Sequence, residues 1–275
     1  MFVHEKNLET KITNNYNGMA NELKSFFNDV YLDVKSQMLS LNFEEYPESF
    51  LVAANIIDDY LQKIDDFSNA YKITSQSKFR STFLEEITVY LTLKILKKND
   101  INLGIYNKNI YAGIHLNNQL DVEVLTKDVD FCIGRSVEMI INKKLNRIIV
   151  PAIAVEIKTY LDGTMFNEVM FSSGNLKNAT PTVKTYVLME FNQTADQKII
   201  TARGRNDVDE MFVLKKDKNS KIDSSVLSDF YHEILMSISG ISETKSIFTP
   251  GRLLRPNLWQ LLIYLQVLEV SVLVL

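Results

Sequence analysis

The apolar residues of the first hundred positions recur at the spacing of amphipathic helices. Segments 17–40, 50–64 and 78–98 each place apolar side chains three or four residues apart, which puts them on one side of a helix. Asn99 and Asp100 end the third segment. We therefore expect a helical N-terminal region to about residue 75, followed by a further helix that leads into the rest of the chain.

From residue 101 onward, the pattern changes to short apolar runs that are typical of strands. The expected strands are 120–125, 129–133, 147–160, 186–191 and 211–214, and the expected helices are 164–176 and 226–239. Pro151 marks a bend or bulge in the longest strand, and Asp162 or Thr164 is expected to cap the helix that follows it. A strand, a helix and a strand in succession form a right-handed crossover with parallel strands. These elements predict an α/β fold in which helices flank a mixed β-sheet.

Composition is that of a globular protein. The 275 residues are 46% hydrophobic and 23% charged, enough for one large domain or two small ones. The single cysteine, Cys132, excludes an intrachain disulfide framework, and the first residues lack a secretory pattern, so we expect a cytoplasmic protein. With one cysteine and three histidines, any metal should be a hard ion held by carboxylates, such as magnesium.

The last stretch, residues 258–275, is almost entirely apolar. Its length approaches a membrane span, but Gln260, Gln266 and Glu269 make it a poor one. We expect a buried terminal helix or strand and no membrane partner. A membrane anchor, or a C-terminus altered by truncation or by a change of reading frame, are the alternatives. The sequence thus divides into a helical region 1–75, a core 76–252 and an apolar segment 253–275.

An acid and a base lie two residues apart in the most strand-like stretch of the chain. Glu156 and Lys158 follow the apolar run 148–153, and positions i and i+2 of a strand point to the same face. Two opposite charges on an apolar strand are costly to bury without a purpose. A solvated cross-strand pair is the alternative, but the apolar run that precedes Glu156 favours a functional site.

The best third partner for this pair is Asp130, an acid between apolar residues in a short expected strand. The nearby acids that compete with it are Asp121, Glu123 and Asp128. If the two strands are neighbours, Asp130 and Glu156 share a sheet edge and, with the carbonyl of Ile157, can hold a magnesium ion. Lys158 can then orient or deprotonate the water that attacks a phosphodiester.

The order of Asp130 and then Glu-Ile-Lys at 156–158 resembles the PD-(D/E)xK nuclease superfamily. The helix before these residues and the strand-helix-strand unit after them match the order of that family, over about residues 77–191. Val129 stands where the family often has a proline. The resemblance implies a restriction-endonuclease-like core with a magnesium site.

Further details of the sequence resemble type II restriction endonucleases within this superfamily. The segment 158–168 is similar to a subgroup that includes DdeI-like enzymes. In many of these endonucleases, a helix before the core contributes a glutamate to the metal site. Glu85 and Glu86 occupy that helix here. Glu86 adjoins the inward-facing Ile87, so we prefer Glu86 as the third acid, with Glu85 or a merely solvated acid as the alternatives.

Binding to DNA requires positive charge near the site. The net charge of −4 argues against nonspecific coating of nucleic acid but allows a local basic cleft. Lys143 and Lys144, just before the long strand, are expected to contact DNA. The small loop that contains Arg203, Arg205 and Asn206 is expected to read bases, because Arg and Asn make bidentate contacts to guanine and adenine edges.

The sequence therefore predicts a magnesium-dependent type II restriction endonuclease that hydrolyses double-stranded DNA at a specific sequence. A palindromic target implies a homodimer, and a heterodimer with a related subunit is the alternative. Two other functions stay open. One is a nuclease of the same fold in repair or phage defence, and the other is a non-catalytic DNA-binding protein that kept the fold. The intact acid and lysine weigh against the second.

Overall fold

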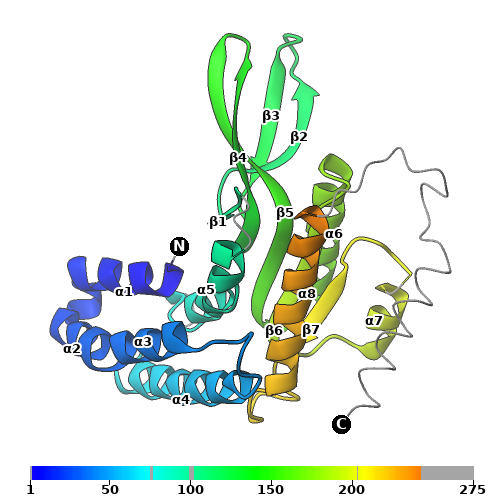
Figure 1. The fold of residues 1–275 in the computed structure, drawn as a ribbon. Coiled ribbons are helices and arrows are strands. Elements are labelled where there is room, and N and C mark those ends of the chain that lie inside the picture. Colours follow the sequence, from blue (N-terminus) through cyan, green and yellow to red (C-terminus); the bar gives the residue numbers. More distant parts are fainter. Residues whose placement is uncertain (1, 75–76, 99–101, 203, 243–275) are drawn as a thin grey trace, which may run out of the picture. The chain divides into compact units, whose positions relative to one another are not determined.

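The computed structural model describes residues 2–74, 77–98, 102–202 and 204–242 (Figure 1). It comprises two compact units, residues 1–238 and 239–275. The predicted boundaries near residues 75 and 252 stay predictions, and the apolar segment 253–275 lies outside the described residues. No helix within the described ranges has the length and hydropathy needed to cross a membrane.

The N-terminal part of the chain is helical, as the hydrophobic spacing predicts. Its helices are α1 (Val3–Thr13), α2 (Ala20–Ser25), α3 (Leu32–Ser40), α4 (Ser49–Ala70) and α5 (Ser81–Lys98). A π-helical turn over Phe26–Tyr31 interrupts the helix expected over 17–40. Helix α1 was not predicted, because its buried side chains include His4 and Lys11 and it therefore lacks a continuous apolar stripe.

Within the described residues, seven strands form one mixed sheet. They are β1 (Gly104–Tyr106), β2 (Ile110–Leu116), β3 (Val122–Lys127), β4 (Phe131–Ile141), β5 (Lys144–Leu161), β6 (Lys184–Asn192) and β7 (Glu210–Val213). Their order is β1-β4-β5-β2-β3, and β6 pairs with both β5 and β7. Strands β4 and β5 are antiparallel, whereas β6 is parallel to β5 and to β7. The predicted mixed sheet and parallel crossover are confirmed.

Helices cover both faces of this sheet (Figure 1). Ile153, Val155 and Ile157 of β5 join one large core with side chains from α1 to α5 and from α8 (Ser224–Ser242). On the opposite face, Val187 and Met189 of β6 pack with side chains of α6 (Gly163–Ala179) and of α7 (Asp196–Ala202). Because side chains alternate along a strand, residues 156 and 158 belong to the face covered by α6.

Two hairpins, β2–β3 and β4–β5, form what we call the arm, which extends beyond the rest of the sheet (Figure 1). The β4–β5 turn consists of Asn142 and Lys143, with φ values of 50° and 63°. Left-handed values at both positions are typical of a two-residue hairpin turn. Asn142 also donates a hydrogen bond from Nδ2 to the carbonyl of Val122 in β3 (2.9 Å). The two hairpins therefore support each other.

Pro151 lies at a β-bulge, as the sequence predicts. The register of β4 and β5 shifts by one residue between the pair Ile133–Ile153 and the pair Gly134–Pro151. A Cβ atom at position 134 would lie 2.6 Å from the carbonyl oxygen of Val150, so only glycine fits there. The bulge separates the arm from the part of β5 that carries the candidate residues.

An ion network joins the helical layer to the sheet. Arg80, just before α5, binds both carboxylate oxygens of Glu190 in β6 and lies 2.7 Å from Asp65 of α4. Lys215 lies 3.1 Å from Glu190 and 3.3 Å from Asp58 of α4. Glu190 is only 1% exposed. Its two cationic partners offset the cost of burying its charge.

The cap of α6 provides a test of the local fold. Asp162 Oδ1 accepts hydrogen bonds from the backbone N–H groups of Thr164 (2.8 Å) and Met165 (2.9 Å), which confirms Asp162 as the cap. The change Asp162→Ala should lower the free energy of unfolding by about 1 kcal/mol, measured by urea denaturation. Asp59→Ala, on the exposed side of α4, is the control, and an equal loss there would contradict the assignment.

Candidate active site

The register of β4 and β5 brings Asp130 against residues 156–158. Asp130 immediately precedes β4, whose first residue, Phe131, pairs with Val155 of β5. The backbone N–H of Ile157 donates to Asp130 Oδ2 (2.7 Å), and Lys158 Nζ donates to the same oxygen (3.0 Å). The predicted adjacency of the two strands is confirmed.

Lys158 lies between two carboxylates. Its Nζ is 3.0 Å from Asp130 Oδ2 and 3.3 Å from Glu156 Oε2, and the three side chains are partly buried, with exposed fractions between 18% and 28%. Burial lowers the pKa of Lys158, but the charges of Asp130 and Glu156 outweigh it and raise the pKa above its ordinary value. The ammonium group therefore carries its proton at neutral pH.

Glu156 has a second cationic partner, which the sequence analysis missed. Lys127 Nζ, at the end of β3, lies 3.4 Å from Glu156 Oε1 and donates to the hydroxyl of Ser172 in α6. Ser172 Oγ in turn donates to Glu156 Oε1 (3.4 Å). Burial raises the pKa of Glu156, but Lys158 and Lys127 outweigh it and hold the pKa below its ordinary value. Glu156 is therefore ionised, with a lysine at each of its oxygens.

Glu85 of α5 approaches Asp130 from the helical layer. The two acids line the same small pocket. Burial raises the pKa of Glu85 to about 7, and the charge of Asp130 adds to this rise, against the opposing charges of Lys78 and Lys158. A carboxyl group that titrates near neutral pH beside another acid is a frequent feature of functional sites.

Glu86 does not face the site, so the sequence-based preference for Glu86 over Glu85 is wrong. Its carboxylate is fully buried. It accepts hydrogen bonds from the backbone N–H groups of His4 (2.9 Å) and Glu5 (3.1 Å) and from the hydroxyl groups of Tyr31 (2.8 Å) and Tyr90. Glu86 thus caps the start of α1 and ties it to α5. The position of Glu86 beside Ile87 correctly indicated that its side chain is buried. The side of α5 that carries Glu86, however, faces α1 and not the candidate site.

The acids that compete with Asp130 lie elsewhere. Glu123 pairs with His115 across the β2–β3 hairpin (3.3 Å), and Asp121 is exposed in the turn of that hairpin. Asp128 accepts a hydrogen bond from the backbone N–H of Asn109 (3.4 Å). Of these four acids, Asp130 is the one that contacts residues 156–158.

The residues expected to contact DNA lie in two separate places. Lys143 and Lys144 lie at the tip of the arm. At a rise of about 3.3 Å per residue, Lys144 is about 45 Å along β5 from the candidate site. Arg205 pairs with Asp207 (2.7 Å) and, together with Asn206, lines a pocket between α6, α7 and β7. Arg203 lies outside the described residues. The structure brings neither group into contact with the acids of the site.

The oxygen ligands at the site suit a hard cation. Asp130 and Glu156 supply carboxylates, and Ile157, whose N–H donates to Asp130, adds a backbone carbonyl to the same short stretch. No group of three or more acids, histidines or cysteines in the described part of the chain is placed to hold a metal by itself. Magnesium commonly binds one or two carboxylates and keeps several waters, so this donor set fits it.

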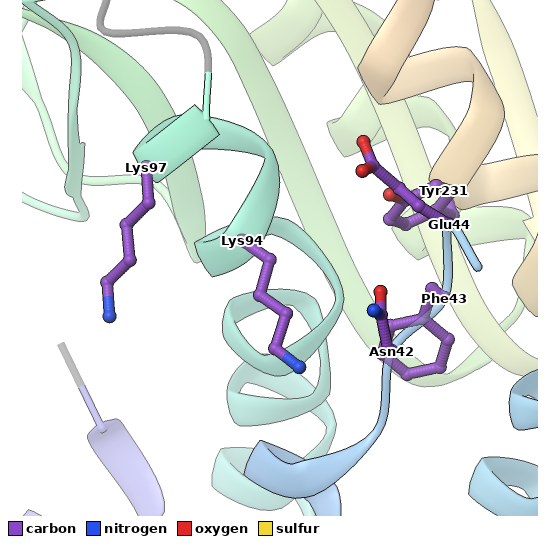
Figure 2. Close-up of a pocket in the computed structure, with 6 residues that line it drawn as sticks. All are labelled: Asn42, Phe43, Glu44, Lys94, Lys97 and Tyr231. Carbon is purple, nitrogen blue, oxygen red and sulfur yellow. The ribbon is translucent and has the colours of Figure 1, made fainter. Parts of the chain in front are cut away.

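A separate pocket lies at the other end of α5, and Figure 2 shows its lining. The lining residues are Asn42, Phe43, Glu44, Lys94, Lys97 and Tyr231. Lys94 is about 14 Å along the helix from Glu85 at 1.5 Å per residue, and its Nζ donates to the carbonyl of Leu41. The pocket has one acid, Glu44, so it lacks the paired carboxylates found beside Lys158.

Comparison with known proteins gives a matching family and matching solved structures, one of which is described below. The sequence model of a family described as Bpu10I restriction endonuclease matches residues 76–234. A solved structure described as the native BbvCI A2B2 tetramer matches with a TM-score of 0.67 and 19% identity, over 88% of this chain and 97% of that chain. None of the curated proteins compared with the chain matches its sequence.

These comparisons bear on the fold and on the extent of the resemblance. The mixed sheet with flanking helices is the restriction-endonuclease-like fold that the sequence predicts. The family match spans Glu85, Asp130 and residues 156–158. Neither comparison names the PD-(D/E)xK superfamily or the DdeI-like subgroup, so both stay predictions.

Glu85 and Glu86 should respond in opposite ways to removal of their charge. Glu86→Gln leaves buried donors without a carboxylate and should lower the free energy of unfolding by about 2–3 kcal/mol. The pKa of Glu85 is higher in the folded state than in the unfolded state. Between about pH 4.5 and about pH 7, Glu85 is therefore ionised in the unfolded state but still protonated in the folded state, and the free energy of unfolding falls as the pH rises. Glu85→Gln should therefore stabilise the protein above pH 7 and have little effect below pH 4.5.

The measurement is urea denaturation of the wild type and both variants at an acidic and an alkaline pH. The two variants make the same isosteric change at neighbouring positions, so each serves as the control for the other. Stabilisation by Glu86→Gln, or a large loss with Glu85→Gln at alkaline pH, would show that the two glutamates have been assigned the wrong way round.

Proposed function

Because the chain belongs to the Bpu10I restriction endonuclease family, we propose that it is a magnesium-dependent type II restriction endonuclease. It hydrolyses phosphodiester bonds of double-stranded DNA at a specific sequence. The observation that carries this proposal is the convergence of Asp130, Glu156 and Lys158 within hydrogen-bonding distance on neighbouring strands. Two carboxylates beside a protonated lysine suit metal-assisted attack of water on a phosphodiester.

Asp130, Glu156 and the carbonyl of Ile157 are the groups that hold the magnesium ion in this proposal. Glu85 assists as a nearby charge beside Asp130 and not as a further ligand, in the place that the sequence analysis gave to Glu86. A bound magnesium ion supplies a positive charge that polarises the phosphate and lowers the pKa of a bound water. The surrounding residues orient these ligands, since Ile157 N–H and Lys158 both fix Asp130 Oδ2.

Lys158 orients the attacking water and offsets the charge that grows on the phosphate. The sequence left two roles open for Lys158, to orient the water or to deprotonate it. To deprotonate the water, Lys158 must first lose its own proton. The carboxylates of Asp130 and Glu156 raise the pKa of Lys158, which opposes that loss. A protonated ammonium group donates hydrogen bonds to water and to phosphate oxygens, so the geometry favours orientation over proton abstraction.

Cleavage of both DNA strands calls for a second active site. A duplex presents its two strands in opposite directions, and a two-fold axis between subunits presents one site to each strand. The similar solved structure is described as an A2B2 tetramer. We propose that this chain likewise acts with a second subunit, either its own copy or a related chain. Lys143 and Lys144 of the arm and the loop of Arg205 and Asn206 are the proposed DNA contacts.

Plasmid digestion tests the proposed activity. The protein, alone or with a related subunit encoded beside it, should convert plasmid DNA to discrete fragments in magnesium chloride and leave it intact in EDTA. Lys158→Ala and Glu156→Ala should each reduce the cleavage rate by at least about 100-fold. Lys63→Ala, an exposed lysine of α4, is the matched control and should cleave normally.

Each outcome of this digestion separates the proposal from its rivals. Magnesium-dependent degradation without discrete fragments would favour a repair or defence nuclease of the same fold. DNA binding with no cleavage under any condition would favour the non-catalytic alternative. Normal cleavage by Lys158→Ala or Glu156→Ala would contradict the proposed site itself.

The pH dependence of cleavage should report Glu85. Burial and Asp130 raise its pKa to about 7, so it is neutral below that pH and negative above it. If the charged form assists the metal, the cleavage rate of the wild type should rise through about pH 7 at limiting magnesium. Glu85→Gln should remove this rise. An unchanged pH profile in that variant would exclude Glu85 from the site.

A further inference from the structure

Lys127 is placed where the arm joins the active site. It is the last residue of β3, and its side chain reaches both Glu156 of β5 and Ser172 of α6. Its side chain is 23% exposed, compared with 18% for Glu156. A lysine with this degree of exposure is partly accessible to a ligand that enters the site, while its partners hold it close to the acids.

The charges at the site balance only while Lys127 and Lys158 pair with the carboxylates. Asp130 and Glu156 carry two negative charges, and the two lysines offset them at distances of 3.0–3.4 Å. A divalent ion held by Asp130 and Glu156 would take up carboxylate oxygens that the lysines now contact. It would compete with Lys127, whose carboxylate partner in the described contacts is Glu156. Displacement leaves a half-buried ammonium group that needs a new anionic partner.

We propose that Lys127 is a DNA-binding residue of the active site, which moves from Glu156 to a DNA phosphate when a divalent ion occupies Glu156. This inference rests on the proposed function. With the ion bound, two lysines and a divalent cation face two carboxylates, so the site has excess positive charge for a polyanion. The Ser172 hydroxyl holds the ammonium group beside Glu156 until that exchange.

The geometry distinguishes Lys127 from Lys158. Lys158 has two carboxylate contacts, Asp130 and Glu156, and the Asp130 oxygen that it contacts also accepts the Ile157 N–H. Among the acids in the described part of the chain, Lys127 contacts Glu156 alone, through the oxygen that Lys158 does not contact. Since Lys127 ends a strand of the arm, a phosphate contact there would also fix the arm relative to the DNA.

DNA binding at varied salt concentration tests this inference apart from cleavage. The full-length protein is titrated against a fluorescently labelled duplex of mixed sequence, in calcium chloride and separately in EDTA. Calcium is a hard cation that takes the same oxygen ligands. In calcium, Lys127→Gln should bind roughly fivefold to tenfold more weakly than the wild type. The slope of log affinity against log salt should fall by about 0.9, the change expected for one lost phosphate contact.

In EDTA, the wild type and Lys127→Gln should have the same salt slope, because Lys127 stays on Glu156. Lys127→Arg keeps the charge and should keep the wild-type slope in calcium. Lys63→Gln removes the same charge from the exposed side of α4 and should change neither slope.

Two results would have different meanings. Equal slopes for the wild type and Lys127→Gln in calcium would overturn the role of Lys127 and leave the proposed endonuclease intact. Failure of the wild type to bind the duplex in any condition would instead count against the proposed function. A thermal unfolding curve for each variant checks that lost binding does not reflect lost folding, and Lys127→Met, which also removes the charge and should show the same reduced slope in calcium, replaces Lys127→Gln if that variant unfolds.

Discussion

The candidate site depends on the antiparallel register of β4 and β5. Asp130 lies 27 residues from Ile157 in sequence, yet its carboxylate accepts the Ile157 N–H at 2.7 Å. The pairing of Phe131 with Val155 sets this contact, and the bulge at Pro151 takes up the extra residue before the arm begins. A slip of one residue would turn Glu156 and Lys158 toward the helical core, so a single strand pairing fixes both the acid and the lysine.

Electrostatic balance explains why such a cluster is tolerated in a partly buried place. Lys158 and Lys127 neutralise Asp130 and Glu156, which keeps the pKa of Glu156 low and that of Lys158 high. Glu85 has no such partner within hydrogen-bonding distance among the described contacts, and its pKa rises to about 7. The same balance prepares the site for a divalent cation, because exchange of a lysine for the ion shifts the charge toward the sign that attracts DNA.

Local patterns in the sequence predicted much of the sheet and half of the site. The strand carrying Glu156 and Lys158, the Asp162 cap and the parallel crossover depend on short-range spacing, and each was found correctly. Glu86 was preferred over Glu85 because adjacency to Ile87 reports burial and not which neighbour a helix faces. Lys127 and Ser172 lie 29 and 16 residues from Glu156, and only the folded sheet and α6 bring them together. Helix α1 was missed because two of its three buried side chains, His4 and Lys11, are polar, and because Glu86, which binds its first N–H groups, lies far away in sequence.

The proposed function requires that Asp130 and Glu156 form a divalent-metal site. The most direct test is an anomalous diffraction map from crystals of the protein soaked in manganese chloride, since manganese takes the same oxygen ligands as magnesium. We expect a peak between the carboxylates of Asp130 and Glu156 that disappears in Asp130→Asn crystals. Manganese bound elsewhere, with no peak between these two carboxylates, would contradict it.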